Sequence, residues 1–388
     1  MTKEQALIAL VGSEVCGRPA ADASVLAAVD RNSLYEFAKE QDLAHLAGAA
    51  LEKLGLLGTE EASQKLRKQA FGALYRCQRM ERELTKICDT LSAVSVPHIP
   101  LKGSVLRGSY PESWMRTSCD IDVLVKQEDL QTAVSALEKA LEYTKAGADA
   151  HEISLFSKNG VHLELHHDLI EENWRSGGEE VLQTVWQHAR PACAGGCTKQ
   201  MPDDLFYFYH IAHMAKHFVL GGCGIRPFLD IWVLNHRVEH DRQARLALLE
   251  QGKLLDFALA AEKLSQVWFG DAKPEEETEK MEDYLFRGGL YGGSETVTAL
   301  RHTKTKGKLG YVLSRIFLPR QELQMEYRVL GKKKWLYPFC QIARWFRLLF
   351  GGKAGHWLGR LRKNAAVTSE QGQEDAGLLR ELGLWEKE

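Results

Sequence analysis

The sequence predicts an α+β fold in which a few short strands occupy the middle of the chain and helices precede and follow them. Short β-like runs are concentrated between residues 95 and 170, whereas residues 1–94 and 171–300 show the three- and four-residue apolar spacing of helices. The composition, 45% hydrophobic and 26% charged, is that of an ordinary globular protein. At 388 residues the chain has room for more than one domain and for a sizeable core.

Residues 1–94 are expected to form a helical N-terminal region. Leu43, Leu46 and Leu54, with small apolar residues between them, follow the spacing that places side chains on one face of a helix. Residues 64–94 continue as a long helical pattern with few helix-breaking residues. The sequence therefore predicts that helices lead directly into the strand-rich part of the chain, residues 95–170.

The strand-rich part opens with the run from Val96 to Leu101, whose prolines suit a strand at the edge of a sheet. Gly103-Ser104 follows as a turn of small residues, and a helix-like pattern continues to Tyr110. Such a turn offers backbone N–H groups and a favourable helix dipole to a phosphate group. Gly103-Ser104 is therefore a candidate phosphate-binding turn.

Asp120 and Asp122 are the most informative pair of residues in the chain. They lie in the β-like run from Cys119 to Val125, where strand alternation places both carboxylates on one face and Ile121 on the other. Two carboxylates so close together repel each other unless a cation lies between them. Mg²⁺ held by one or two carboxylates and by substrate phosphates is the usual arrangement. A phosphate turn followed by a carboxylate pair points to nucleotide chemistry.

A β-hairpin is expected around Asn159-Gly160, a dipeptide typical of tight hairpin turns between two β-like runs. In the second strand of this hairpin, His162, Glu164 and His166 share one face because side chains alternate along a strand. A third carboxylate, Glu164, is therefore expected to lie on a strand neighbouring the Asp120 and Asp122 strand.

The C-terminal part of the chain divides into three segments by composition. Residues 171–300 form a helical domain, residues 301–363 a basic aromatic segment with 16 Lys and Arg against two acids, and residues 364–388 an acidic tail. This charge split predicts either a specialised C-terminal segment or one that packs against the acidic body. The basic segment suits RNA contact or an anionic membrane surface, or its apolar side packs on the body with the charges solvated.

No targeting signal is evident in the sequence. The first residues lack the pattern of a signal peptide, and no apolar run is long enough to span a bilayer. The eight cysteines show no regular framework, and the close pair Cys193 and Cys197 is expected to be two loop thiols. The protein is therefore expected to be cytoplasmic, with reduced thiols.

Taken together, the motifs resemble a known family, the uncharacterised bacterial nucleotidyltransferases of the DNA polymerase beta superfamily. The resemblance covers roughly residues 30–240 in order. The segments that carry it are Leu101-Lys102-Gly103, Tyr110-Pro111, Arg116, Asp120 to Val125, Leu163 to His166, His213, Lys216-His217, Arg226 and Phe228-Leu229-Asp230.

The resemblance implies a small mixed sheet with flanking helices, and transfer of a nucleoside monophosphate from an NTP, with ATP favoured, to an acceptor. Asp120 and Asp122 would bind Mg²⁺, with Mn²⁺ as a substitute. Glu164 would complete a second metal site and help to activate the acceptor. Two metal ions about 3.5–4 Å apart can stabilise both the attacking and the leaving oxygen of an in-line displacement.

By the same resemblance, Gly103-Ser104 would hold the triphosphate, and Lys102 or Arg116 would add positive charge. The interval between Ser104 and Asp120 is longer than in the wider superfamily. A second glycine–serine pair, Gly108-Ser109, lies closer to Asp120 and is a rival phosphate turn. Gly103-Ser104 is preferred because a strand-like run precedes it.

Other interpretations of the chain stay open at this point. His166 and His167 either contact substrate or are hydrogen-bonded at a strand end, and His213 and His217 either share a metal or pack and contact phosphate. A catalytically silent nucleotide-binding regulator is the first alternative function, although all three acidic residues of an active site are present. The second is a membrane- or RNA-binding adaptor that uses residues 301–363.

Overall fold

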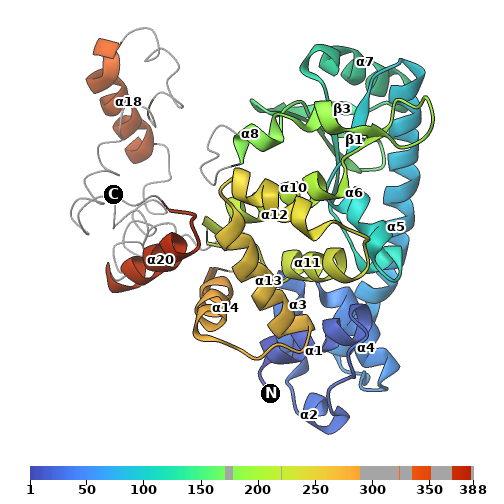
Figure 1. The fold of residues 1–388 in the computed structure, drawn as a ribbon, viewed down its shortest axis with the longest axis vertical. Helices are drawn as coiled ribbons and strands as arrows, with labels where there is room; N and C mark the ends of the chain where they lie inside the picture. Colours follow the sequence, from blue (N-terminus) through green and yellow to red (C-terminus); the bar gives the residue numbers. More distant parts are fainter. Residues whose placement is uncertain (171–177, 220, 289–322, 324–333, 351–368, 386–388) are drawn as a thin grey trace.

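The computed structural model describes residues 1–170, 178–219, 221–288, 323, 334–350 and 369–385 (Figure 1). Most of the predicted basic aromatic segment, 301–363, lies outside these residues. Within them, the strands form a small mixed sheet and helices make up most of the rest, so the predicted α+β class is confirmed. No helix in these ranges is both long and apolar enough to cross a membrane.

The main sheet of the described chain has five strands in the order β1-β2-β5-β4-β3. The strands are β1 (His98–Pro100), β2 (Asp120–Val125), β3 (Thr144–Ala148), β4 (Glu152–Phe156) and β5 (His162–His166). Strands β2 and β5 are parallel, and the other neighbouring pairs are antiparallel. The proline-containing strand lies at one end of the order, and β4 and β5 form the predicted hairpin.

A short second hairpin lies beside β1 as a separate two-stranded sheet. It consists of β6 (Arg190–Pro191) and β7 (Lys199–Gln200), and Thr198 forms a bridge to His98. The backbone N–H of His98 donates a hydrogen bond to the carbonyl of Cys197 at 3.2 Å. Cys193 and Cys197 are free thiols in this hairpin, as expected.

Helices precede the strands of the sheet in the sequence, lie between them and follow them. Those before it are α1 (Lys3–Val15), α2 (Ala23–Ala27), α3 (Arg31–Glu40), α4 (Ala44–Lys53) and α5 (Glu61–Ala93). Between the strands lie α6 (Gly103–Leu106), the 3₁₀ turns η1 (Arg107–Ser109), η2 (Ser113–Met115) and η3 (Gln127–Asp129), and α7 (Leu130–Leu141). After the sheet come α8 (Glu179–Leu182), α9 (Val185–His188), α10 (Asp203–Val219), α11 (Arg226–His236), α12 (Arg242–Gln251), α13 (Leu255–Phe269), α14 (Glu276–Gly288), η5 (Lys334–Leu336), α18 (Tyr337–Phe350) and α20 (Ser369–Glu381).

One hydrophobic core lies between the sheet and helices α5 and α7. Ile121 and Val123 of β2 and Leu163 of β5 are fully buried in it, together with Ile87 of α5 and Leu137 of α7. These strand residues alternate with the polar residues of the opposite face, as the sequence predicts. Burial of one face therefore fixes the direction in which Asp120, Asp122 and Glu164 point, which is away from α5 and α7.

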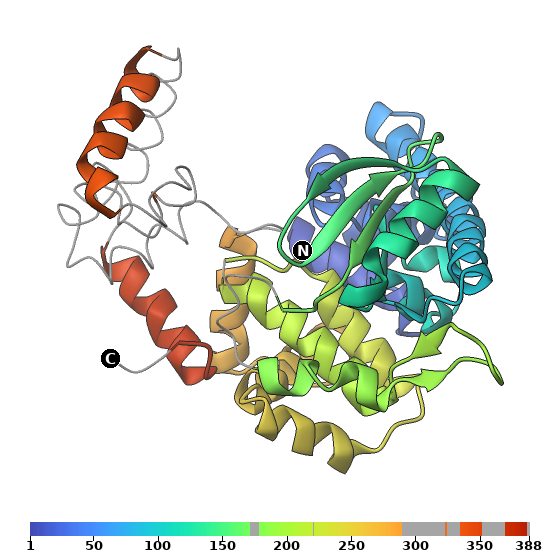
Figure 2. The ribbon, with the colours of Figure 1, turned by 90° about the horizontal axis from the view of Figure 1, so that it is seen from above.

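A second core joins helices from both ends of the chain. Leu7 of α1, Leu46 of α4, Phe228 of α11 and Phe257 of α13 are buried in one cluster. The sequence suggests residues 1–94 and 171–300 as separate helical regions, but residues 1–94 and the described part of 171–300 pack around common apolar side chains. The acidic tail takes part as well, because α20 lies beside α14 and contributes the buried Leu379 (Figures 1 and 2).

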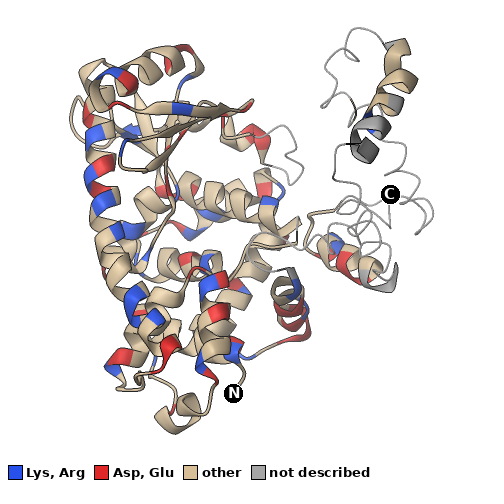
Figure 3. Ribbon diagram, turned by 180° about the vertical axis from the view of Figure 1, so that it is seen from behind, with Lys and Arg blue, Asp and Glu red and all other residues tan. Residues whose placement is uncertain are grey.

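Helix α5 connects the two cores. Leu66 near its beginning is buried in the helical core, and Ile87 near its end is buried under the sheet. Both acidic and basic side chains occur along this helix, which forms one side of the molecule (Figures 1 and 3). The long helix thus sets the position of the sheet relative to the helical core.

Candidate functional site

The three predicted acidic residues come together on the polar face of the sheet. In the parallel pairing of β2 and β5, Asp122 lies opposite Glu164 and Asp120 lies opposite His162. The potential ligand atoms of Asp120, His162 and Glu164 lie within 4.8 Å of one another, and so do those of Asp122, Glu164 and His166. The site thus offers carboxylate and imidazole donors close enough together to hold a divalent ion.

Lys102 is held directly against these carboxylates. Its Nζ lies 2.7 Å from Oδ1 of Asp122 and 3.9 Å from Oε2 of Glu164. The backbone N–H of Leu101 donates to the carbonyl of Asp122 at 3.0 Å, which fixes the neighbouring strand. The φ angle of Lys102 is +45°, a conformation that favours glycine, so this residue keeps a strained backbone at the site.

The electrostatics of the two aspartates differ. Burial alone would raise the pKa of Asp122, but the Lys102 ammonium and the hydrogen bond from His166 outweigh it and hold this pKa well below its usual range. Burial, and then the charges of Asp122 and Glu164, raise the pKa of Asp120 to about 6. Asp122 is therefore the firmly ionised member of the pair. The carboxylate of Asp120 is repelled by those of Asp122 and Glu164.

His166 lies deeper in the same cluster. Its Nε2 is 3.0 Å from Oδ1 of Asp122, and its Nδ1 is 3.4 Å from Oε2 of Glu152 on the neighbouring strand. Burial would lower the pKa of His166, but hydrogen bonds with Asp122 and Glu164 raise it to about 9. The predicted site residues did not include Glu152. Glu152 lies directly opposite His166 in the pairing of β4 and β5. Strand alternation in β4, which puts Ile153 and Leu155 on the buried face and Glu152 on the other, is the signal that could have found it.

Gly103-Ser104 lies next to Lys102 and begins α6. A Cβ atom on Gly103 would lie only 3.1 Å from Cβ of Ser118, so the turn approaches its neighbour closely. Arg107 holds Gly103 and Ser118 together. Its Nε donates to the carbonyl of Gly103 at 3.0 Å, and its Nη2 donates to Oγ of Ser118 at 2.9 Å. Within the described part of the chain, Oγ of Ser104 is buried and has no hydrogen-bond partner.

The expected helix dipole at this turn is corrected by the structure. Helix α6 has four residues, and η1 continues it as a 3₁₀ turn. A single helical turn carries only a small dipole, because the macrodipole requires many aligned peptides. Any phosphate at this turn would therefore depend on single N–H and hydroxyl groups and on Lys102.

The rival pair Gly108-Ser109 has a different environment. A Cβ atom on Gly108 would meet nothing within 4 Å, and the residue is exposed in η1. The carbonyl of Ser109 accepts a hydrogen bond from Nε of Arg237 at 3.2 Å. This pair thus lacks the close packing that surrounds Gly103-Ser104.

Arg116 is not aimed at the carboxylate cluster. Its Nε and Nη2 donate to the two carboxylate oxygens of Asp230 at 2.7 and 3.0 Å, and Nη1 donates to the carbonyl of Thr117 at 2.7 Å. The hydroxyl of Tyr110 donates to the same carboxylate at 2.6 Å. A Cβ atom on Gly103 would lie 3.5 Å from Nη1 of Arg116, so this buried ion pair supports the glycine turn from behind.

Helix α10 faces the site from the helical core. The rings of its His213 and His217 are edge-to-face with centroids 4.6 Å apart. Burial and the nearby charge of Lys102 hold the pKa of His213 well below its usual range, so this imidazole is neutral. Among the described residues, neither histidine belongs to a group of three potential metal ligands.

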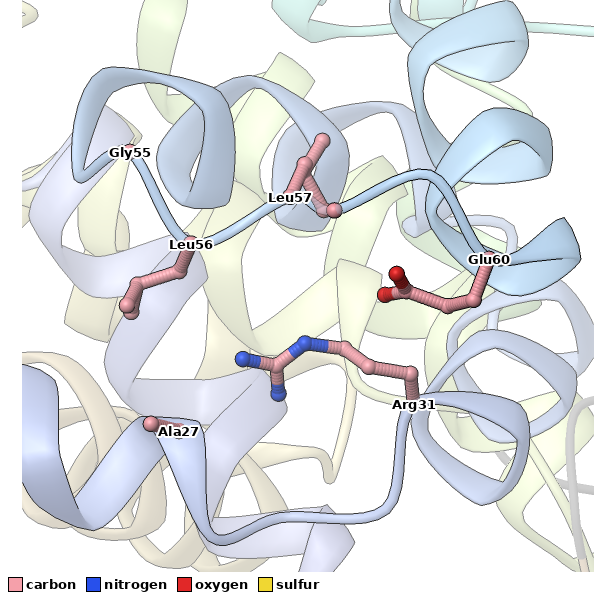
Figure 4. A pocket seen from close by; sticks show the side chains of 7 residues that line it. Ala27, Arg31, Gly55, Leu56, Leu57 and Glu60 are labelled. Carbon is pink, nitrogen blue, oxygen red and sulfur yellow. The ribbon is translucent and has the colours of Figure 1, made fainter.

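A hollow on the surface lies elsewhere, among the N-terminal helices. Its volume is about 380 Å³, and the side chains of Arg31 and Glu60 extend into it from the same side (Figure 4). Nη1 of Arg31 donates to the carbonyls of Leu26 and Val29 at 2.8 and 3.0 Å, so the guanidinium is used within the fold. None of the predicted site residues lines this hollow.

Comparison with known proteins gives one match. A family model described as "Uncharacterised nucleotidyltransferase" matches residues 27–270, a span that contains the whole five-stranded sheet and helices α3 to α13. No curated protein and no solved structure matches significantly. The matched span covers more than half of the chain and includes the carboxylate cluster, and the chain therefore belongs to this uncharacterised nucleotidyltransferase family.

Proposed function

We propose that the protein transfers a nucleoside monophosphate from an NTP to an acceptor, with Asp120, Asp122 and Glu164 as ligands of Mg²⁺ or Mn²⁺. ATP is the favoured donor. The observation that carries this proposal is the convergence of the three carboxylates on one face of adjacent parallel strands. Each aspartate has a potential ligand atom within 4.8 Å of one from Glu164. Family membership supplies the reaction class, that of a transferase.

The reaction would proceed by in-line displacement at the α-phosphorus. An acceptor oxygen or nitrogen forms the new bond to this phosphorus, the bond to the bridging oxygen breaks, and pyrophosphate leaves. A divalent ion supplies charge neutralisation for the phosphate oxygens when it is bound. The protein would contribute mainly position and electrostatic stabilisation. Glu164, which is less buried than Asp122, would help to take the proton from the acceptor.

Lys102 and Gly103-Ser104 would bind the triphosphate. The ammonium of Lys102 is already positioned between Asp122 and Glu164, so it is placed to neutralise phosphate charge beside the carboxylates. The buried hydroxyl of Ser104 is a donor without a partner among the described residues. Arg116 would act as a positioning residue through the glycine turn, because Asp230 and Thr117 engage its guanidinium.

Labelled nucleotides test this proposal directly. The purified protein is incubated with each α-³²P-labelled NTP, Mg²⁺ or Mn²⁺ and a cell extract, in parallel with Asp122→Asn and with Glu128→Gln, an exposed acid outside the site. We expect the label on an acceptor with the native protein and Glu128→Gln, and none with Asp122→Asn. Label from γ-³²P-ATP should appear in pyrophosphate instead of on the acceptor. Absence of both label transfer and metal–NTP binding would overturn the proposal.

Contact of the basic aromatic segment, 301–363, with RNA or an anionic membrane is a separate proposal. It is supported by 16 Lys and Arg against two acids, with aromatic residues among them. Charge reversal of Lys332, Lys333 and Lys334 to Glu should weaken binding of RNA or of anionic vesicles. If the variant bound RNA and vesicles as the native protein does, these three lysines would have no role in either contact.

A further inference from the structure

The proposed metal centre contains an imidazole as well as carboxylates. Building on the proposed function, we infer that His166 is a direct ligand of the divalent ion through Nε2, and that Glu152 orients its ring. The ion would then have a mixed set of oxygen and nitrogen ligands. Such a centre prefers Mn²⁺ to Mg²⁺.

The position of His166 carries the first step of this inference. It follows Glu164 by two residues on β5, so both side chains lie on the polar face of the sheet. The imidazole is buried, and its Nε2 lies 3.0 Å from Oδ1 of Asp122 and 3.6 Å from Oε2 of Glu164. A ring nitrogen is therefore directed at the same two carboxylates that would hold the ion.

Glu152 carries the second step. It lies directly opposite His166 in the pairing of β4 and β5, with its Oε2 3.4 Å from Nδ1 of the imidazole. Metal-bound histidines commonly present their second ring nitrogen to a carboxylate, which fixes the tautomer and the ring orientation. The ring of His151 stacks on that of His166 with centroids 6.1 Å apart, which further restricts the ring. Nε2 is thereby the nitrogen left for the ion, and binding of the ion would release the Nε2 proton, because a histidine ligand is neutral.

His162 provides a matched comparison on the same strand and the same face. Its Nδ1 is 3.9 Å from Oε1 of Glu164, its Nε2 is 2.6 Å from Oγ of Ser154, and its ring stacks on Phe156 with centroids 4.5 Å apart. His166 contacts both Asp122 and Glu164, whereas the carboxylates nearest to His162 are those of Glu164 and Asp120. His162 can itself reach an ion at Asp120 and Glu164, so it is the rival nitrogen ligand, and the exposed His188 serves as the control histidine.

The preference for Mn²⁺ follows from ligand chemistry. Mg²⁺ is bound almost entirely through oxygen and retains water, whereas imidazole nitrogen suits transition-metal ions and Mn²⁺ also accepts carboxylate oxygen. Replacing one oxygen ligand by nitrogen therefore costs Mg²⁺ more affinity than it costs Mn²⁺. We expect the native protein to bind Mn²⁺ at least about tenfold more tightly than Mg²⁺.

Pulsed EPR of Mn²⁺ bound to the full chain tests the ligand directly. We expect a ¹⁴N coupling typical of coordinated imidazole in the native protein, replaced by a ¹⁵N coupling when the histidines are ¹⁵N-labelled. The coupling should persist in His162→Asn and disappear in His166→Asn. Because the native protein is itself informative, the test does not depend on a folded His166 variant.

Binding affinities provide the second measurement. Calorimetry should show that His166→Asn lowers the Mn²⁺/Mg²⁺ affinity ratio towards one, and that His188→Asn, at an exposed histidine outside the site, leaves the ratio unchanged. Glu152→Gln should weaken Mn²⁺ binding about ten- to hundredfold and retain the nitrogen coupling. Bound Mn²⁺ without nitrogen coupling, or with coupling that persists in His166→Asn, would overturn this inference and leave the proposed function intact. Absence of any Mn²⁺ binding, with or without NTP, would instead overturn the proposed function and this inference together.

Discussion

At the scale of single residues, Gly103 is distinguished from Gly108 by the space around it. A methyl group on Gly103 would meet Cβ of Ser118 at 3.1 Å, whereas one on Gly108 would meet nothing within 4 Å. The neighbouring atoms around Gly103 must move by a few tenths of an ångström to accept a Cβ. This makes the pair of glycines a natural test of which turn binds phosphate.

We expect Gly103→Ala to weaken NTP binding about tenfold, equivalent to about 1.4 kcal/mol, because the turn must shift relative to Lys102. Gly108→Ala should leave the affinity unchanged. The measurement is fluorescence titration with a labelled NTP in the presence of Mg²⁺. Loss of affinity in Gly108→Ala, with Gly103→Ala unaffected, would identify Gly108-Ser109 as the phosphate turn.

At Asp120 the proposed metal-binding role conflicts with the stability of the fold. Its pKa is raised from the usual 3.8 to about 6, by burial and by the charges of Asp122 and Glu164, so the fold favours its protonated form. Ionised Asp120 therefore destabilises the metal-free protein. This penalty is absent below the unfolded-state pKa, increases between pH 4 and 6 and is complete above pH 6.

Asp120→Asn should therefore raise the midpoint of thermal unfolding at pH 7.5 in the presence of EDTA, by about 2–6 °C. The gain should become smaller at pH 5, and metal binding should be lost. Differential scanning fluorimetry at the two pH values measures both effects when Mn²⁺ is added to a parallel sample. A variant that unfolds at a lower temperature at pH 7.5, or a gain equal at both pH values, would contradict the assignment of repulsion to Asp120.

At the scale of elements, a buried ion pair connects the loop before β2 with helix α11. Arg116 and Asp230 are 114 residues apart, and both are almost completely buried, with Tyr110 bonded to the same carboxylate. Removal of one partner from such a pair leaves an uncompensated buried charge. The pair thus fixes the glycine turn relative to the helical core.

Asp230→Asn should accordingly lower the free energy of unfolding by about 3–5 kcal/mol. Tyr110→Phe removes only one hydrogen bond to this carboxylate and should cost less, about 1–2 kcal/mol. Urea unfolding followed by circular dichroism gives both values. Losses below about 1 kcal/mol in both variants would show that the pair is not a structural connection.

At the scale of the whole molecule, the two ends of the chain share one hydrophobic core. Leu379 of α20 is fully buried in the cluster that also contains Leu7 of α1, and Arg287 of α14 contacts Asp375 of α20 at 3.0 Å. The acidic C-terminal helix is thus part of the folded body. The packing suggested by the charge split concerns the basic residues 301–363, most of which lie outside the described residues.

Leu379→Ala should lower the free energy of unfolding of the body by about 2–5 kcal/mol, because it leaves a cavity in the common core. Glu381→Ala changes an exposed side chain of the same helix and should stay within about 0.5 kcal/mol of the native value. Thermal unfolding followed by both circular dichroism and tryptophan fluorescence is the measurement. An unchanged main transition in Leu379→Ala would mean that α20 folds separately from the rest.

The sequence by itself determined the parts of the protein that depend on local pattern. Alternation in the run 120–125 placed Asp120 and Asp122 on the same face of their strand. Alternation in the hairpin around Asn159-Gly160 placed Glu164 on the face of its strand that also carries His162 and His166. The long helix before the sheet and the helices after it followed from apolar spacing. These features could be predicted because period-two and period-3.6 patterns are set by neighbouring residues.

Only the tertiary structure decided which of these faces meet and which charges pair. The parallel register of β2 and β5 places Asp122 opposite Glu164. The guanidinium of Arg116 is paired with Asp230 and does not face the carboxylate cluster. Strand β3, fully exposed and interrupted by a bulge, carried no alternation to predict it. Such contacts join residues far apart in sequence, and their energies depend on burial and distance, which a local pattern does not contain.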